Sequence, residues 1–359
     1  MTLPKPIKFN VERYIGGLSS FKKKKKVFKL SANESALGAS PKAAKAFIKE
    51  KNNIFLYPES DSNSLRDLIA KKFHIEQSRI ICGSGSDQIF DLTCRLFLKP
   101  KDEVIVTEFG FIMHKIYSLF YKAKIKVAKE KNFKASVDEI IKKVTNKTKI
   151  VFIANPNNPT GTYLSKSEMI SLRKRLRKNI LLVVDDAYFE FLDRPDFSSG
   201  LDIFKNFQNV LITRTFSKIY GLAGLRIGWA YSSKKIINAM YEIKPPFNVN
   251  RAALETAKEA IKDNNWTKKA IKHNKLWSKK IFNVLKQYKI KTNKPSANFF
   301  LMSFEKTKIN AQSVFKKLRN KGIILREMKQ YKIHNALRLT IGKKKANEYF
   351  IKNIIKILK

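Results

Sequence analysis

Five short apolar runs alternate with helical patterns along the chain, and this alternation constrains its fold more than any other feature. The runs are residues 79–82, 103–106, 149–153, 180–184 and 210–212. Their unbroken hydrophobicity is typical of strands buried on both faces. Between the first two runs, Ile89, Leu92, Leu96 and Phe97 recur at helical spacing on one face. Strands that alternate with helices predict an α/β fold with a mainly parallel sheet.

The composition indicates a globular chain. Its 359 residues, 43% of them hydrophobic, can form one large core or two medium ones. No stretch approaches the roughly 18 apolar residues of a membrane span, and residues 1–8 lack the hydrophobic region of a signal peptide. We therefore expect a cytoplasmic protein with no membrane partner. Cys82 and Cys94 have no His or Cys at metal-ligand spacing nearby, so we expect buried thiols and no metal site.

The net charge of +45 raises the question of a nucleic-acid partner. Only 14 of the 74 basic residues are arginine, whereas base and phosphate recognition favours the planar arginine fork. The lysines are spread along the chain, and we interpret the one dense run, residues 22–26, as a solvated loop. We expect no nucleic-acid partner. The alternative, a nucleic-acid-binding protein that carries this fold, predicts binding with a steep dependence on salt.

The residues that follow the five predicted strands are polar or aromatic, and they form one candidate site. In parallel sheets, ligands bind beyond the carboxyl ends of the strands, where loops and helix N-termini converge. In chain order the strands are followed by residues 83–87 (Gly-Ser-Gly-Ser-Asp), Phe109, residues 155–161 with Asn158, Asp185 with Tyr188, and Lys218. The first segment suits a phosphate at a helix N-terminus, and the Phe109 ring can stack on a planar heterocycle.

Lys218 lies where a strand ends and a glycine-rich turn begins, within residues 213–226. Apolar neighbours and the nearby Arg214 and Arg226 destabilise its ammonium form, which lowers the pKa and favours the neutral amine that condenses with an aldehyde. Together with a carboxylate, a stacking ring and a phosphate-binding turn, such an amine meets the requirements of pyridoxal 5'-phosphate. The sequence therefore predicts pyridoxal 5'-phosphate as the cofactor.

Six blocks of sequence then carry a family resemblance. They are residues 29–38 (Lys-Leu-Ser-Ala-Asn-Glu-Ser-Ala-Leu-Gly), 56–59 (Leu-Tyr-Pro-Glu), 83–87, 154–161 (Ala-Asn-Pro-Asn-Asn-Pro-Thr-Gly), 213–226 and 335–342 (Asn-Ala-Leu-Arg-Leu-Thr-Ile-Gly). With these blocks the chain resembles the aspartate aminotransferase superfamily of fold type I and, more narrowly, the histidinol-phosphate aminotransferase family. The resemblance implies a large domain with a mainly parallel seven-stranded sheet and a smaller α/β C-terminal domain.

The resemblance implies roles for the residues of the cofactor site. Lys218 would bind the cofactor as a Schiff base and then transfer protons as a general acid and base. Asp185 would pair with the pyridinium N–H, while Asp186 would point away because side chains alternate along a strand. Asn158 and Tyr188 would bind the phenolic oxygen of the cofactor, and Phe109 would stack on its ring. The phosphate would be held by Ser86 and Asp87 through their backbone N–H groups, together with Thr215, Ser217 and Arg226.

The resemblance also implies a substrate site and a partner subunit. Arg338 would bind the carboxylate or phosphate group of a substrate through its guanidinium. Arg326 would add positive charge nearby, with a structural salt bridge as the equal alternative, and the arm around Tyr14 would help to close the site. Tyr57 would reach the cofactor phosphate of a neighbouring subunit, which implies a homodimer.

The sequence thus predicts a transaminase. Residues 1–45 would form an N-terminal arm and part of the small domain, residues 46–260 the large cofactor-binding domain and residues 261–359 the small C-terminal domain. The resemblance implies amino-group transfer between L-histidinol phosphate and 2-oxoglutarate in histidine biosynthesis. An aromatic amino-acid aminotransferase and a threonine-phosphate decarboxylase on the same scaffold remain as alternatives.

Overall fold

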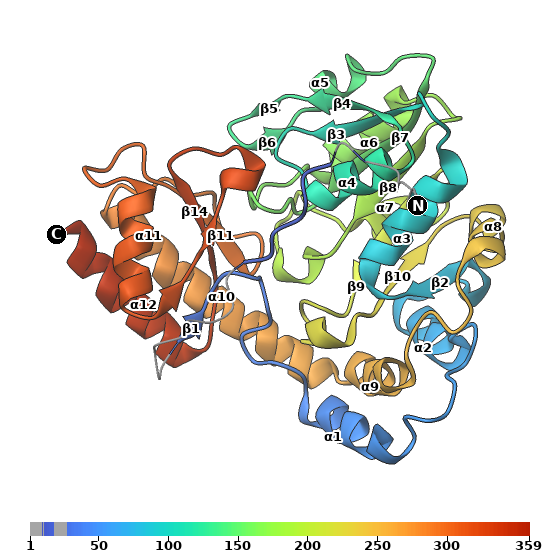
Figure 1. Cartoon of the computed structure of the whole chain (residues 1–359), viewed down its shortest axis with the longest axis horizontal. Helices are drawn as coiled ribbons and strands as arrows, with labels where there is room; N and C mark the ends of the chain where they lie inside the picture. Colours follow the sequence, from blue (N-terminus) through green and yellow to red (C-terminus); the bar gives the residue numbers. More distant parts are fainter. Residues whose placement is uncertain (1–8, 10, 18–26) are drawn as a thin grey trace, which may run out of the picture.

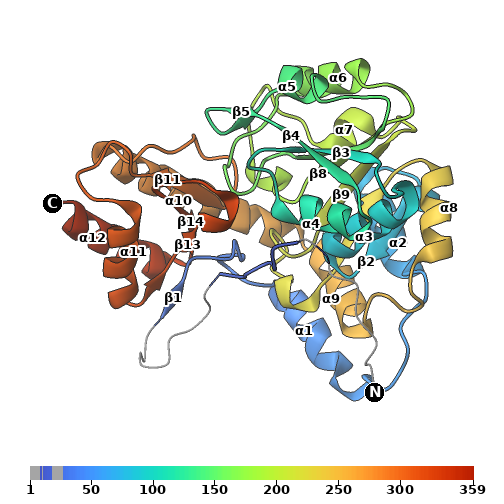
Figure 2. The ribbon, with the colours of Figure 1, turned by 45° about the horizontal axis from the view of Figure 1, so that its top comes forward.

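The computed structural model describes residues 9, 11–17 and 27–359. The predicted loop at residues 22–26 and the N-terminal residues 1–8 lie outside this range. Figures 1 and 2 show two lobes: a central sheet covered by helices, and a C-terminal lobe, coloured orange to red, with the long helix α10 (Asn264–Gln287) running between them.

The larger lobe is built on a seven-stranded sheet of the described residues, with strand order β2-β10-β9-β8-β7-β3-β4. The strands are β2 (Ile80–Gly83), β3 (Glu103–Thr107), β4 (Lys124–Ala128), β7 (Thr148–Ala154), β8 (Leu181–Asp185), β9 (Val210–Thr215) and β10 (Gly228–Tyr231). All are parallel to one another except β10, which is antiparallel to both neighbours. The mainly parallel sheet and its five predicted strands are confirmed.

Two strands were missed, each for a local reason. Strand β4 lies at the sheet edge and carries the exposed Lys124 among alternating residues, so it lacks the continuous apolar run of a central strand. Strand β10 is the four-residue segment Gly-Trp-Ala-Tyr, which is too short to give a pattern of its own. A further pair, β5 (Glu130–Lys131) and β6 (Lys134–Ala135), forms a separate hairpin.

Helices cover both faces of the sheet because each strand alternates its apolar side chains between two cores. Ile80 and Cys82 face one core and Ile81 faces the other. The first core includes residues of α1 (Pro41–Lys49), α2 (Asn63–Phe73), α5 (Val137–Ile141), α6 (Lys166–Arg175), α7 (Gly200–Phe204) and α9 (Arg251–Lys262), and the second includes residues of α3 (Gly85–Phe97), α4 (Ile112–Phe120) and α8 (Lys234–Ile243). No helix of the described ranges is both long and apolar enough to cross a bilayer.

The C-terminal lobe has its own core, and the N-terminal segment contributes to it. Its strands are β11 (Phe299–Ser303), β13 (Arg326–Glu327) and β14 (Ala336–Thr340) in one sheet, and β1 (Phe28–Lys29) paired with β12 (Ile323–Ile324). Its helices are α11 (Ala311–Asn320) and α12 (Lys344–Leu358). Leu30 is buried in this core. Residues from the two ends of the chain therefore form one unit.

Helix α10 spans the junction between the lobes. Ala270 near its start belongs to the core of the larger lobe, whereas Trp277 belongs to the C-terminal core. Ala43 of α1 also packs in the core of the larger lobe. We keep a two-domain division as a proposal and place its boundaries just before α1 and within α10, close to the predicted positions at residues 46 and 260.

Candidate active site

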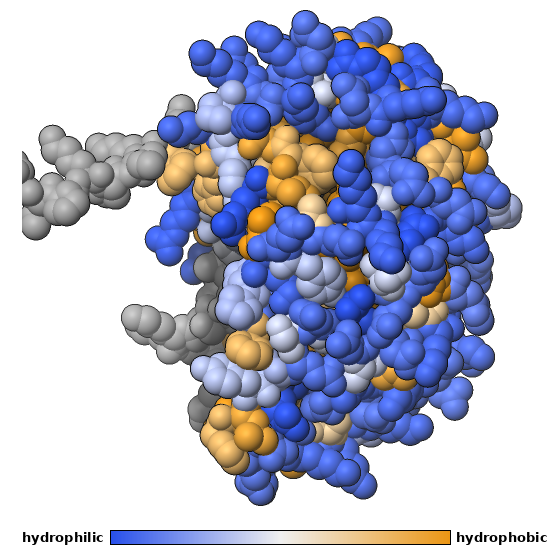
Figure 3. All heavy atoms as spheres, turned by 90° about the vertical axis from the view of Figure 1, so that its right-hand side faces the viewer, coloured by the Kyte–Doolittle hydropathy of each residue, from blue (hydrophilic) through white to orange (hydrophobic). Residues whose placement is uncertain are grey.

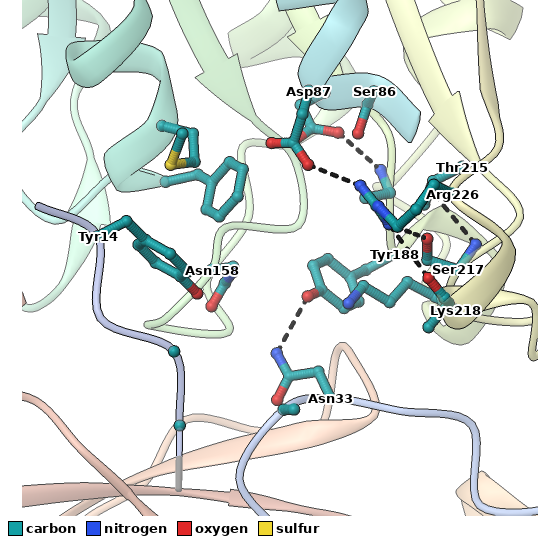
Figure 4. Close-up of a pocket in the computed structure, with 18 of the residues that line it drawn as sticks. Tyr14, Asn33, Ser86, Asp87, Asn158, Tyr188, Thr215, Ser217, Lys218 and Arg226 are labelled. Atoms are coloured by element: carbon teal, nitrogen blue, oxygen red, sulfur yellow. Dashed lines mark hydrogen bonds and ion pairs between the residues drawn. The ribbon is translucent and has the colours of Figure 1, made fainter. Parts of the chain in front are cut away.

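A cavity of about 980 Å³ lies between the two lobes, and it gathers the residues that follow the strands (Figure 4). Of the predicted site residues, it is lined by Tyr14, Ser86, Asp87, Asn158, Asp185, Tyr188, Thr215, Ser217, Lys218, Arg226, Arg326 and Arg338. Phe109 and Tyr57 do not line it. Strands β2, β7, β8 and β9 all end at this cavity, as expected for a parallel sheet.

Lys218 follows β9 and extends its amine into the cavity (Figure 4). Burial is the main cause that lowers the pKa of Lys218 to about 8, and the positive charges of Arg338 and Arg226 lower it further. Its Nζ lies 5.6 Å from the centroid of the Tyr188 ring. A lysine in these surroundings holds a substantial neutral fraction near physiological pH, which is the form that attacks a carbonyl carbon.

Asp185 ends β8 and is 5% exposed. Its Oδ1 accepts hydrogen bonds from Oγ1 of Thr213 at 3.3 Å and from the backbone N–H of Ala187 at 3.2 Å. Asp186 points to the opposite side, where it accepts a hydrogen bond from the Gly200 N–H at 3.0 Å and lies 3.6 Å from Arg214. The alternation expected for these two carboxylates is therefore confirmed.

His114 is a neighbour of Asp185 that the sequence gave no reason to select. It lies on α4, and its Nε2 is 3.7 Å from Oδ2 of Asp185. Its ring is buried and stacks on Phe152, with 4.8 Å between the ring centroids. A single histidine in an apolar helical pattern is indistinguishable in sequence from a core residue, and only the packing of α4 on the sheet brings it to the carboxylate.

The segment after β2 and the turn after β9 form an anion-binding region. Asp87 lies in the first turn of α3, whose leading N–H groups have no helical acceptor. Arg226 donates from Nη2 to Asp87 at 2.8 Å and from Nη1 to Oγ of Ser217 at 3.3 Å. Thr215 Oγ1 accepts from the Ser217 N–H at 3.1 Å. The positive charge of Arg226 and the helix N-terminus thus face the same volume.

Arg338 of β14 reaches across the cavity to the larger lobe. It is buried, and its Nη1 donates to Oδ1 of Asn158 at 2.5 Å while its Nη2 donates to the carbonyl of Ser31 at 2.8 Å. Its Nε is buried without a hydrogen-bond partner in the described structure. The guanidinium therefore retains donor capacity beside the cavity, which suits a carboxylate or phosphate ligand.

Arg326 lies on strand β13, directly opposite Arg338 of the neighbouring strand β14. Its Nη2 donates to the carbonyl of Ile15 at 2.6 Å, and its guanidinium lies 5.7 Å from the centroid of the Tyr14 ring. Among the described residues, no carboxylate lies within ion-pair distance of Arg326, so the salt-bridge alternative is wrong for this part of the chain. Arg326 instead attaches the Tyr14 segment to the cavity wall.

Comparison with known proteins identifies the family that this geometry belongs to. The family model "Aminotransferase class I and II" matches residues 25–354. The chain belongs to the class I and II aminotransferase family. It is 54% identical to a histidinol-phosphate aminotransferase of Pelagibacter ubique over 99% of both chains, and 39% identical to one of Maricaulis maris over 90% of both.

Solved structures agree on the fold of this aminotransferase. A histidinol-phosphate aminotransferase from Sinorhizobium meliloti, in complex with pyridoxal-5'-phosphate, superposes with a TM-score of 0.85 at 20% identity, covering 92% of this chain and 90% of that one. A histidinol-phosphate aminotransferase from Clostridium acetobutylicum superposes with a TM-score of 0.84 at 22% identity, covering 92% of this chain and 99% of that one. At these identities the likeness establishes the fold, which is the fold type I architecture predicted from the sequence.

Phe109, the predicted stacking ring, does not line the cavity. In this aminotransferase the Phe109 ring packs against Phe133, with 5.4 Å between the centroids, and its backbone N–H is held by Glu130. The turn after β3 directs that ring away from the cavity and against the buried cluster around Met328, and Phe111 at the start of α4 lines the cavity instead. Both rings follow the same strand, and the sequence does not reveal how many residues the turn uses. We propose Phe111 as the stacking ring.

Tyr57 lies away from the cavity of its own chain. It is 78% exposed, and its ring stacks on Phe247 with 4.5 Å between the centroids. A role for Tyr57 in the site of a second subunit stays a prediction for this aminotransferase.

Tyr188 has a partner that the sequence analysis also missed. It is almost fully buried, and its hydroxyl accepts a hydrogen bond from Nδ2 of Asn33 at 3.0 Å (Figure 4). Burial is the largest cause that raises the pKa of Tyr188 to about 12, partly offset by Arg338 and by the Asn33 hydrogen bond. Tyr188 therefore stays protonated at physiological pH and can donate its own proton to a ligand.

Proposed function

We propose that this aminotransferase transfers the amino group between L-histidinol phosphate and 2-oxoglutarate, with imidazole acetol phosphate and glutamate as the other pair, in histidine biosynthesis. The observation that carries the proposal is the presence of the Lys218 amine and the buried Arg338 guanidinium in one cavity. The name shared by the relatives, at 54% and 39% identity, supports the choice of substrate.

The described residues fit pyridoxal 5'-phosphate as the cofactor. The α3 N-terminus with Arg226 and Ser217 suits its phosphate, Asp185 its pyridine nitrogen, and Asn158 and Tyr188 its phenolic oxygen. Gly85, at φ +75°, supports the fit, because a Cβ there would overlap the Arg226 guanidinium that closes the phosphate site. The cofactor supplies an aldehyde that condenses with amines and a ring that accepts an electron pair.

Two residues of the chain would then carry out proton transfer and stabilise the charge on the cofactor. Neutral Lys218 would move a proton from the Cα of the amino substrate to the cofactor carbon in one half-reaction, and from that carbon to the Cα of the oxo acid in the other. Asp185, held by Thr213 and Ala187, keeps the pyridine nitrogen protonated by its negative charge.

Arg338 would anchor both substrates in turn. Its guanidinium can bind the carboxylate of glutamate or the phosphate of histidinol phosphate with the same pair of N–H groups. Arg326 and Tyr14 lie at the same end of the cavity and would contact the substrate's distal group. One anion site thus serves two differently shaped substrates, as a ping-pong reaction requires.

We also propose a homodimer located in the cytoplasm. On the face shown in Figure 3, apolar patches interrupt an otherwise hydrophilic surface. The exposed apolar side chains of the described chain include Ile54, Phe55, Tyr57 and Phe247, which are adjacent in sequence or in contact. Exposed aromatic clusters of this kind support a subunit interface. In the dimer, Tyr57 would reach the phosphate of the neighbouring site.

Subunit mixing tests that arrangement. Lys218→Ala and Tyr57→Phe each impair a different half of the composite site. A heterodimer of the two variants keeps one site with both native residues, so random mixing should restore about a quarter of wild-type sites. If activity after mixing equals the sum of the separate variants, Tyr57 does not act in the partner's site.

The function itself is tested by absorbance and turnover. Purified protein loaded with pyridoxal 5'-phosphate should lose its cofactor absorbance band on addition of histidinol phosphate and regain it with 2-oxoglutarate. Faster turnover of phenylalanine than of histidinol phosphate would favour an aromatic aminotransferase, and release of carbon dioxide from threonine phosphate would favour a decarboxylase. Salt-sensitive binding to DNA without a cofactor band would favour the nucleic-acid alternative.

A further inference from the structure

Asn33 lies at the centre of a hydrogen-bonded chain that connects strand β14 of the C-terminal lobe to Tyr188 of the larger lobe. Its Nδ2 donates to the Tyr188 hydroxyl at 3.0 Å. Its backbone N–H donates to Oγ1 of Thr340 at 2.9 Å, and that hydroxyl donates back to Oδ1 of Asn33 at 3.0 Å. Thr340 is two residues beyond Arg338 on β14. The chain therefore links the strand of the substrate anchor to the cofactor site.

The contact with Thr340 fixes the orientation of the Asn33 amide. The Thr340 hydroxyl uses a lone pair to accept from the backbone N–H, so its own proton is free to donate to Oδ1. With Oδ1 engaged, the NH₂ group of Asn33 faces Tyr188. An amide NH₂ can only donate, so the Tyr188 oxygen is the acceptor and its own proton is left for another partner.

The backbone around Asn33 is held as firmly as its side chain. Asn33 is 1% exposed and has a left-handed φ of 55°, a conformation that asparagine tolerates better than most residues. Its carbonyl accepts from Nδ2 of Asn298 at 3.1 Å. Two residues earlier, the carbonyl of Ser31 accepts from Arg338. The segment carrying Asn33 is thus fixed to the same strand as the anion-binding guanidinium.

Three charged or titratable groups face Tyr188 besides Asn33. Arg338 and Asp185 act on its hydroxyl through their charges, and the Lys218 amine lies over its ring. Phe299 packs edge-on against the ring with 5.1 Å between centroids. Asn33 alone among these donates a hydrogen bond to the oxygen itself. A donor at that oxygen strengthens the Tyr188 O–H as a hydrogen-bond donor, because it stabilises the negative charge left behind.

We propose that Asn33 is a positioning residue that directs the Tyr188 proton toward the cofactor's phenolic oxygen and ties this contact to the strand bearing Arg338. The proposal rests on pyridoxal 5'-phosphate binding but not on the identity of the amine substrate. The Asn33 hydrogen bond makes the Tyr188 hydroxyl a stronger hydrogen-bond donor. A stronger donor favours the deprotonated form of the cofactor's phenolic oxygen. It therefore lowers the pH at which the bound cofactor loses its proton.

The test is a pH titration of the absorbance of the cofactor-loaded protein without substrate. Asn33→Gly keeps the left-handed backbone and removes the amide, and it should move the titration midpoint upwards by about one pH unit. Asn33→Asp keeps the shape but offers an acceptor in place of a donor, so it should capture the Tyr188 proton and move the midpoint at least as far. Thr340→Val, which frees the amide to rotate, should give a smaller upward shift.

A double-variant comparison separates positioning from a merely structural role. Tyr188→Phe should itself raise the midpoint, and adding Asn33→Gly to it should cause no further shift. The matched control is Asn335→Asp: Asn335 is also left-handed, at φ 47°, and its Oδ1 accepts from the Ala311 N–H, a contact that aspartate retains. That control should keep the wild-type midpoint.

Two results would overturn the proposal: an unchanged midpoint in folded Asn33→Gly, or an equal shift with and without the Tyr188 hydroxyl. If Asn33→Gly fails to fold, Asn33→Asp and Thr340→Val in the same comparison decide the matter. Failure of the proposed function is distinguishable, because wild-type protein would then bind no cofactor or show no turnover of histidinol phosphate. With cofactor bound, the titration remains decisive whatever the amine substrate.

Discussion

Nη1 of Arg338 lies 2.5 Å from Oδ1 of Asn158, and this hydrogen bond joins the two lobes across the cavity. Asn158 follows β7 of the larger lobe, whereas Arg338 belongs to β14 of the C-terminal lobe. A substrate anion bound by Arg338 therefore contacts a group whose position depends on both lobes. Substrate binding and cofactor orientation are thus coupled through a single side-chain pair.

Replacing Arg338 by lysine tests this coupling. Arg338→Lys keeps the charge but cannot reach Asn158 and the Ser31 carbonyl together, so kcat/KM should fall about 10- to 100-fold, the equivalent of one or two charged hydrogen bonds. Steady-state kinetics with histidinol phosphate and with glutamate should both be affected. Arg175→Lys, at an exposed ion pair with Asp138, is the control and should leave kcat/KM unchanged. A fall in kcat/KM for only one of the two substrates would contradict a shared anion site.

The sequence predicted those parts of the site that follow strands. Strand ends can be located from apolar runs, and the residues directly after them, such as Asp185 and Lys218, then fall at one edge of the sheet. Positions that depend on a turn's length or on packing between distant segments were not predictable. Phe111 is separated from Phe109 by one tight turn. His114 reaches the site only through the packing of α4. Asn33 reaches it only because the N-terminal segment crosses to β14.

Phe111 and Phe109 form a natural pair for testing the stacking role. Phe111→Leu removes an aromatic face from the cavity and should weaken binding of pyridoxal 5'-phosphate about 3- to 10-fold, since aromatic stacking contributes about 0.5–1.5 kcal/mol. Phe109→Leu changes a ring that packs against Phe133 and the cluster around Met328 and does not line the cavity, so it should leave cofactor affinity unchanged. The measurement is a cofactor titration followed by absorbance. Equal losses of affinity in both variants would exclude a specific role for Phe111.

Gly85 tests the phosphate site. At φ +75° an added Cβ would be strained and would overlap Nη2 of Arg226. Gly85→Ala should therefore displace Arg226, weaken cofactor binding by at least about 10-fold and reduce the free energy of unfolding by about 1–2 kcal/mol. Gly224→Ala is the matched control, because nothing lies within 4 Å of the Cβ it would introduce. Cofactor affinity and urea unfolding should be measured for both, and wild-type affinity in Gly85→Ala would argue against this phosphate site.

The lowered pKa of Lys218 predicts a pH-dependent effect on stability. Burial lowers the pKa of Lys218 in the folded chain to about 8 from its ordinary value of 10.5. Between those pH values the unfolded chain binds more protons than the folded one, so wild-type stability should rise with pH across this window. Below about pH 8 the folded site must hold a disfavoured charge. Lys218→Met removes that cost, so the variant without cofactor should be more stable than wild type at pH 7, by at most about 3 kcal/mol.

That advantage should shrink as the pH rises toward 10, because wild-type Lys218 then becomes neutral in both states. Urea unfolding of the two cofactor-free proteins at pH 7 and pH 9.5 measures the difference, and other titrating groups cancel because both proteins contain them. Lys275→Met is the control, because the Lys275 side chain is 76% exposed. Its free energy of unfolding should differ from that of wild type by the same amount at both pH values. A constant advantage for Lys218→Met would mean that its amine is not held in a charge-disfavouring site, and would remove the physical basis for its nucleophilicity.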